Sequence, residues 1–239
     1  RHVEALQAYQ RATQINPALE SSWRSQLELC RMLNQKELGQ RAFNQLKHLK
    51  SSPKAIVSVS DLLAQGKLAR AEALCRQILE RQPRNVEAMR LLANIASQTG
   101  ALTEAEFLLE SATVFAPANH QVRIDYVQLL RRRQKFKEAL LQAEQLLATA
   151  PENPQFKSLY AIESMQMGDF EGALKYFNSI LQQLPDDAIT LTSRGHALKT
   201  MGDSAAAIES YREAMRVRPD HGEAYYSLAN LKTYRFSQQ

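Results

Sequence analysis

The sequence predicts an all-α solenoid built from repeated pairs of helices, and three observations support this prediction. Prolines recur every 34 residues, at Pro83, Pro117, Pro151, Pro185 and Pro219. Alanines keep the same spacing twelve residues before each proline, at Ala71, Ala105, Ala139, Ala173 and Ala207. Single glycines separate the two halves of most repeats, at Gly66, Gly100, Gly168 and Gly202. A fixed period of this length is typical of helical-repeat arrays, which grow by adding repeats.

Glycine and proline mark the places where the predicted helices end. Glycine adopts the positive φ that closes a helix, whereas proline stops the preceding helix because it lacks an amide hydrogen and clashes with the previous turn. Apolar residues between these marks follow helical spacing, as in Leu91, Leu92 and Ile95. Each repeat is therefore expected to contain two amphipathic helices, neither of which could bury its apolar face alone.

The whole chain is expected to form a single repeat domain over residues 1–239. The segment AIVSVSDLL is rich in β-branched residues, but the repeat register predicts a helix there. Residues 20–51 form an irregular repeat, with Gly39 where the other repeats have alanine. The predicted order is a partial repeat at 1–19, the irregular repeat at 20–51, five repeats at 52–85, 86–119, 120–153, 154–187 and 188–221, and a partial repeat at 222–239.

The composition excludes several classes of protein. Apolar residues make up 44% of the chain, but no apolar run approaches the roughly 20 residues that a membrane span needs. The first residues lack the apolar core of a signal peptide, so a cytoplasmic protein is expected. The net charge of +5 comes without a basic and aromatic stripe, so nucleic acid is not an expected partner. Cys30 and Cys75 are expected to be small buried residues and not a disulfide.

The pattern and period resemble those of the tetratricopeptide repeat. The residues that carry the resemblance are the aromatic residues Trp23 and Tyr225, the small residues Gly195, Ala229 and Ala207, then Tyr211 and Pro219. The resemblance covers nearly the whole chain. It implies a right-handed α-α superhelical solenoid, in which the first helix of each pair lines a groove that binds extended peptides or partner helices.

By this family geometry, the groove is lined by polar and mildly basic residues of the first helices. Amide side chains can pair with a peptide backbone and arginine pairs with carboxylates, so an acidic, extended peptide is the expected ligand. The predicted groove residues are Arg90, Asn94, Gln128, Arg131, Arg132, Gln155, Ile162, His196 and Lys199.

Three groups of these residues admit more than one interpretation. Arg90 and Asn94 match the start of the carboxylate clamp of chaperone-binding tetratricopeptide domains, but the clamp is incomplete, because Asp125, Gln155 and Ser158 stand where it needs other residues. The basic run 131–137 either stabilises a helix end through the dipole or attracts an anionic partner. His196 and Lys199 are either ordinary surface residues or lie at an interface with a further domain.

A narrower resemblance lies near the end of the chain. Residues 195–200 (GHALKT) and residues 228–233, followed by Arg235, Phe236 and Ser237, are similar to the last repeats of bacterial tetratricopeptide-repeat sulfotransferases. In that family a catalytic domain follows the repeats and uses 3′-phosphoadenosine 5′-phosphosulfate. The resemblance implies that this domain would lie beyond Gln239 and could contact the repeats.

No catalytic or metal-binding constellation is visible in the sequence. The five histidines are scattered and the glycines are single, so neither a zinc site nor a phosphate loop is expected, and no cofactor is expected in this chain. The preferred hypothesis is a protein- or peptide-binding scaffold, which recruits substrates or partners for a sulfotransferase. The alternative is a free-standing adaptor that assembles a protein complex, and a third possibility is a homo-oligomer built through the terminal helices.

Overall fold

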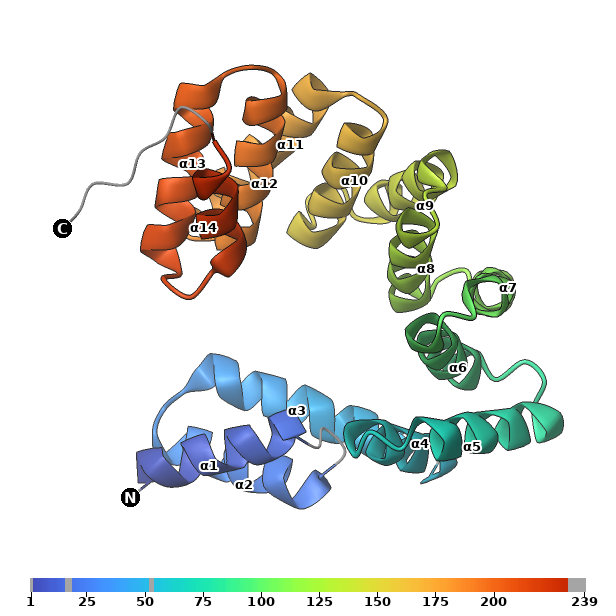
Figure 1. The fold of residues 1–239 in the computed structure, drawn as a ribbon. Helices are drawn as coiled ribbons and strands as arrows, with labels where there is room; N and C mark the ends of the chain where they lie inside the picture. The colour runs from blue at the N-terminus through green and yellow to red at the C-terminus, as the bar shows by residue number, and fades with distance from the viewer. Residues whose placement is uncertain (1, 16–18, 52–53, 232–239) are drawn as a thin grey trace. The chain divides into compact units, whose positions relative to one another are not determined.

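The computed structural model describes residues 2–15, 19–51 and 54–231, and this part of the chain forms fourteen α-helices and no strand (Figure 1). The all-helical fold confirms the predicted fold class. The helices are α1 (His2–Ile15), α2 (Glu20–Met32), α3 (Lys36–Ser51), α4 (Lys54–Ala64), α5 (Leu68–Arg81), α6 (Val86–Thr99), α7 (Leu102–Phe115), α8 (His120–Arg132), α9 (Phe136–Thr149), α10 (Pro154–Gln166), α11 (Phe170–Gln183), α12 (Ala188–Thr200), α13 (Ser204–Val217) and α14 (Gly222–Ala229).

The helices group into two compact units. Unit 1 is residues 1–119 and contains α1 to α7, and unit 2 is residues 120–239 and contains α8 to α14. Within each unit, helices that follow one another pack as antiparallel pairs, for example α6 with α7 and α12 with α13. The helix predicted for AIVSVSDLL is confirmed as α4.

The turns inside the pairs depend on a left-handed residue. Gly66, Gly100, Gly168 and Gly202 have φ values between 70° and 90°. Gln134 takes the place of glycine between α8 and α9, with φ 59°. At this turn the N–H of Lys135 donates to the carbonyl of Leu130 at 2.9 Å, which satisfies one of the carbonyls at the end of the helix.

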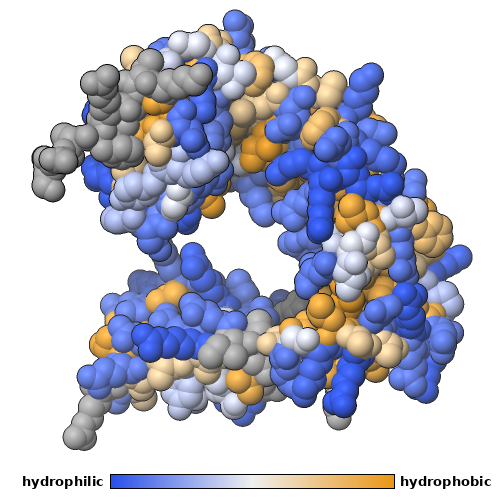
Figure 2. Space-filling view, in the orientation of Figure 1, coloured by the Kyte–Doolittle hydropathy of each residue, from blue (hydrophilic) through white to orange (hydrophobic). Residues whose placement is uncertain are grey.

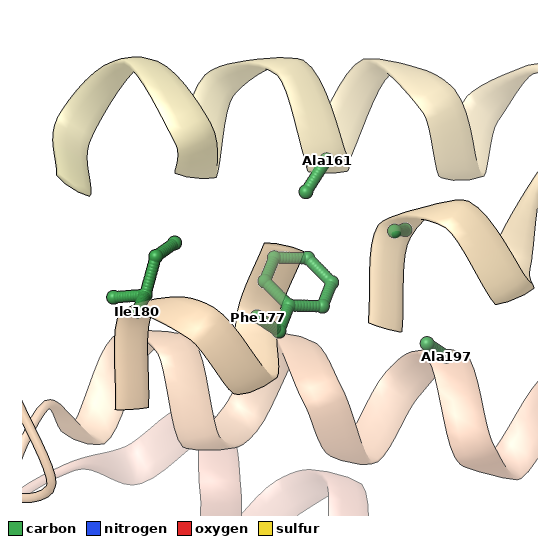
Figure 3. Packing of buried hydrophobic residues seen from close by; sticks show 5 residues of the cluster. Ala161, Phe177, Ile180 and Ala197 are labelled. Carbon is green, nitrogen blue, oxygen red and sulfur yellow. The ribbon is translucent and has the colours of Figure 1, made fainter. Parts of the chain in front are cut away.

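The recurring alanines are part of the buried core. Ala71, Ala105, Ala139, Ala173 and Ala207 are all fully buried. In unit 2, Phe177 of α11 packs with Ala161 of α10 and Ala197 of α12, so one large ring joins two successive pairs (Figure 3). Because protein interiors are close-packed, the ring of Phe177 fits here only beside short side chains such as those of Ala161 and Ala197.

The core of the described residues consists mainly of buried alanine and aliphatic side chains, and the face shown in Figure 2 is largely hydrophilic with scattered hydrophobic side chains. Cys30 and Cys75 are buried free thiols, and burial raises the pKa of Cys75 to about 11. Over the described ranges, no helix has the length and apolar character needed to cross a membrane.

Candidate peptide-binding face

The 34-residue period places predicted site residues at equivalent positions on successive first helices. Gln128 of α8, Ile162 of α10 and His196 of α12 are 34 residues apart in unit 2, and Asn94 holds the same register position on α6 in unit 1. Asn94 and Gln128 are exposed, whereas Ile162 and His196 are half-buried. In unit 2 these residues define one face of the first helices, which we call the first-helix face.

Arg131 is bound to a carboxylate of the next pair. Its Nε donates to Oε1 of Glu163 at 2.6 Å, which connects α8 with α10. The Glu163 side chain is 0% exposed and the Arg131 side chain is 31% exposed. Burial raises the pKa of Glu163, and the hydrogen bond and positive charge of Arg131 oppose this shift. The positive charge of Arg131 is therefore largely offset by the carboxylate of Glu163.

His196 is held by two neighbouring helices. Its Nδ1 lies 3.1 Å from the hydroxyl of Tyr211 on α13, and its Nε2 lies 3.3 Å from Oε1 of Glu223 on α14. The two rings meet edge to face, with centroids 5.5 Å apart. Tyr211 is fully buried, and burial raises its pKa to about 12, so its hydroxyl stays protonated. His196 thus links α12, α13 and α14.

Four predicted residues of unit 2 remain exposed. Gln155 lies in the first turn of α10, where its backbone N–H donates to the capping Oδ1 of Asn153 at 2.9 Å. Gln128, Arg132 and Lys199 project from α8 and α12 with exposed side chains. Arg132 and Lys199 lie in the last turns of their helices, where a positive charge is stabilised by the helix dipole.

In unit 1, Arg90 and Asn94 have partners on their own helix. Arg90 forms a two-pronged ion pair with Glu87, at 3.0 and 2.6 Å, and Oδ1 of Asn94 accepts from Nε2 of Gln98 at 2.6 Å. These interactions order the side chains along the surface of α6. The incomplete clamp predicted from the sequence therefore starts from residues that already have local partners.

The sequence reasoning did not identify Glu163 as a site residue. A signal was present, because Glu163 occupies a register position that is apolar in the neighbouring repeats, as Leu129 and Ala197. Both of these residues are buried. An acidic residue at such a position needs a charged partner, and Arg131 precedes it by about one repeat.

Comparison with known proteins decides the family. The model of the cytochrome c-type biogenesis protein H TPR domain matches residues 73–191, and a tetratricopeptide-repeat model matches residues 188–221. The chain is a tetratricopeptide-repeat protein.

Several known proteins are similar to this tetratricopeptide-repeat chain. The CTR9 homolog of Arabidopsis thaliana is 26% identical over 97% of this chain and 22% of its own length. The human cell division cycle protein 16 homolog is 29% identical over 58% of this chain and 24% of its own length. The chain thus spans less than a quarter of these curated relatives.

Solved structures share the fold of this tetratricopeptide-repeat chain. YrrB, described as a TPR protein with an unusual peptide-binding site, superposes with a TM-score of 0.60 at 19% identity, over 77% of this chain and 96% of YrrB. MamA from Desulfovibrio magneticus superposes with a TM-score of 0.61 at 13% identity, over 71% of this chain and 98% of MamA. At these identities the similarity concerns the fold alone.

Proposed function

We propose that the first-helix face of unit 2 binds an extended peptide of a partner protein. The observation that carries this proposal is the recurrence of exposed polar side chains on successive first helices, with Gln128 on α8, Gln155 on α10 and Lys199 on α12. A peptide in extended form offers a backbone N–H or carbonyl at each residue, and glutamine side chains can both donate and accept. The peptide-binding site named for YrrB supports the same kind of ligand.

We propose further that the peptide is acidic, because the charged side chains in the last turns of α8 and α12 are positive. Arg132 and Lys199 are exposed, whereas the charge of Arg131 is offset by Glu163. The attraction of an acidic peptide is therefore expected to depend on Lys199 more than on Arg131. Such an attraction between exposed charges should weaken as salt is added.

The proposal is tested by selecting dodecapeptides from a random display library on the full chain and measuring their affinity by fluorescence anisotropy. The variant Lys199→Glu should weaken the binding of acidic peptides about tenfold, since it replaces an attraction with a repulsion. The matched control is Lys175→Glu, which makes the same change at an exposed position on the second helix α11. Equal affinities of both variants and the unchanged protein would contradict the proposal.

A separate proposal is that this scaffold serves a sulfotransferase domain elsewhere in the same polypeptide. It rests on the resemblance of residues 195–200, which lie on α12, and of residues 228–233 with Arg235, Phe236 and Ser237, of which 232–237 lie outside the described residues. The test is sulfate transfer from 3′-phosphoadenosine 5′-phosphosulfate by the protein at its natural length. Absence of transfer, together with a stoichiometric partner in a pull-down, would favour the free-standing adaptor.

A further inference from the structure

A pocket of about 580 Å³ lies between α2 and α3 in unit 1. Its lining includes Leu27 and Cys30 of α2 and Gly39 and Phe43 of α3. Arg31 and Lys36 lie at the end of the pocket near the turn that joins the two helices. Its volume is within the range of about 300–1,000 Å³ that is common for ligand pockets.

The pair α2 and α3 differs from the other pairs at two positions that line the pocket, Gly39 and Phe43. Gly39 replaces the alanine that the other second helices bury, so its backbone leaves space next to Cys30. Phe43 occupies the register position of Cys75, Phe177 and Tyr211, all of which are 0% exposed, yet Phe43 is 48% exposed. A large apolar side chain that is covered in the other pairs therefore faces the open pocket.

The chemistry of the lining indicates the class of ligand. Leu27 and Phe43 provide apolar surface that a ligand would remove from water, and the buried Cys30 lies beneath it. Arg31 and Lys36 provide two positive charges, and no carboxylate lines the pocket. Within the described part of the chain, neither cation forms an ion pair with another residue. An apolar group that carries a negative charge would complement both parts.

We propose that this pocket binds an apolar side chain of a partner polypeptide, with an acidic residue beside it that pairs with Arg31 and Lys36. The apolar side chain packs against Phe43 and fills the space left by Gly39. The flanking carboxylate accepts hydrogen bonds from the cations at the turn. The pocket would give the scaffold a second point of attachment, independent of the peptide face of unit 2.

The test uses three fluorescein-labelled nonapeptides in the same Gly-Ser framework and the full chain. Their central residues are Asp-Phe-Glu, Asp-Ala-Glu and Asn-Phe-Gln, so that the last two lack either the apolar group or the charge. We expect the first peptide to bind and each of the others to bind at least about tenfold more weakly in fluorescence anisotropy. Equal affinities of the three peptides, or no binding of the first, would overturn the proposal.

Variants of the protein locate the site. Gly39→Met should fill the pocket and Arg31→Glu should repel the peptide, and each should raise the Kd about tenfold or more. Arg41→Glu is the control, because it makes the same charge change on α3 at an exposed residue outside the pocket lining. If Gly39→Met fails to fold by circular dichroism, Arg31→Glu decides the result. Unchanged affinity of Arg31→Glu would refute the pocket as the binding site.

One further variant separates this proposal from the proposed function. Lys199→Glu alters the first-helix face of unit 2 and should leave binding of the Asp-Phe-Glu peptide unchanged. If Lys199→Glu weakens this peptide as much as Arg31→Glu does, the peptide binds the face of unit 2 and the pocket proposal fails. If only Arg31→Glu has an effect, the pocket is a separate site, whatever the outcome for the peptide face.

Discussion

At the scale of single residues, two helical glycines show how the same substitution meets different surroundings. A methyl group added at Gly195 would lie 2.5 Å from Cε1 of Tyr211, whose ring is fully buried. A methyl group added at Gly39 would lie 3.4 Å from Cβ of Cys30, which is an ordinary contact. Gly195 faces the buried ring of Tyr211. Phe43, which occupies the register position of Tyr211 in the pair that contains Gly39, is 48% exposed.

We therefore expect Gly195→Ala and Gly39→Ala to change stability in opposite directions. Gly195→Ala should lower the free energy of unfolding by about 1–3 kcal/mol, because the buried ring of Tyr211 must shift. Gly39→Ala should raise it by about 0.5–1 kcal/mol, because alanine has the higher helix propensity. Urea denaturation followed by circular dichroism measures both values. A change of the same sign in both variants would show that the two sites are packed alike.

The buried carboxylate of Glu163 should leave its mark on the pH dependence of stability. Burial raises its pKa above the ordinary value, so the folded state holds the proton more tightly than the unfolded state. The contribution of this group to the free energy of unfolding is therefore fully present at low pH and is lost as the pH rises through the raised pKa. Glu163→Gln removes this titration, while its amide can still accept a hydrogen bond from Arg131.

We expect the difference in unfolding free energy, Glu163→Gln minus the unchanged protein, to grow as the pH rises from about 4 to about 7. Urea denaturation at a series of pH values measures this difference. Asp125→Asn is a suitable control, because Asp125 is only half-buried on α8 and accepts from Gln121 on the same helix. A difference that stays constant with pH would mean that the Glu163 carboxylate has the same pKa in the folded and unfolded states.

At the scale of the helix pair, the turn conformation was predictable wherever glycine marks it. The turn between α8 and α9 has the same left-handed conformation without a glycine, since Gln134 has φ 59°. A residue with a Cβ is strained there, and the flanking helices hold it in place through their packing. The repeat period alone locates this turn, because Gln134 follows Gly100 by 34 residues.

Gln134→Gly should therefore stabilise the protein by about 0.5–1 kcal/mol, the strain relieved minus the added freedom of the unfolded chain. Gly100→Ala is the matched reverse change at the equivalent turn, where φ is 88°, and should destabilise by about 1 kcal/mol. Thermal and urea unfolding measure both variants. Destabilisation by Gln134→Gly would indicate that its side chain makes contacts worth more than the backbone strain.

At the scale of the whole molecule, the repeat architecture limits how far a local change extends. Among the described residues of each unit, the extensive contacts join helices that are next to each other or one apart in sequence, so stability is close to a sum of repeat and interface contributions. A destabilised pair near one end should therefore loosen its neighbours and leave distant pairs unchanged. This behaviour differs from that of a globular domain with one shared core.

Hydrogen exchange of Gly195→Ala should reveal this local response. Amide hydrogens of α12 and α13 should exchange faster than in the unchanged protein, because the altered contact joins these two helices. Amide hydrogens of α2 and α3 in unit 1 should exchange at the same rate in both proteins. Faster exchange over the whole chain would instead indicate that both units unfold as one cooperative body.

The sequence by itself determined the helical fold, the repeat register and the position of nearly every turn. These features depend on local spacing, since proline, glycine and the small alanines act on their own helix or its direct partner. The first-helix residues could be named from this register. Their exposure and partners could not, because they depend on which side chains of the same and neighbouring helices the packing brings together.

Only the tertiary structure decided which of these residues are free to contact a partner. Arg131 is paired with Glu163 and His196 with Tyr211 and Glu223, while Lys199 stays exposed. The pocket between α2 and α3 could not be predicted from the sequence either, because Gly39 indicates only that a methyl group is missing. The structure revealed that Phe43 beside it is uncovered. The physical reason is that burial and charge pairing arise from packing between helices, which repeat spacing alone does not specify.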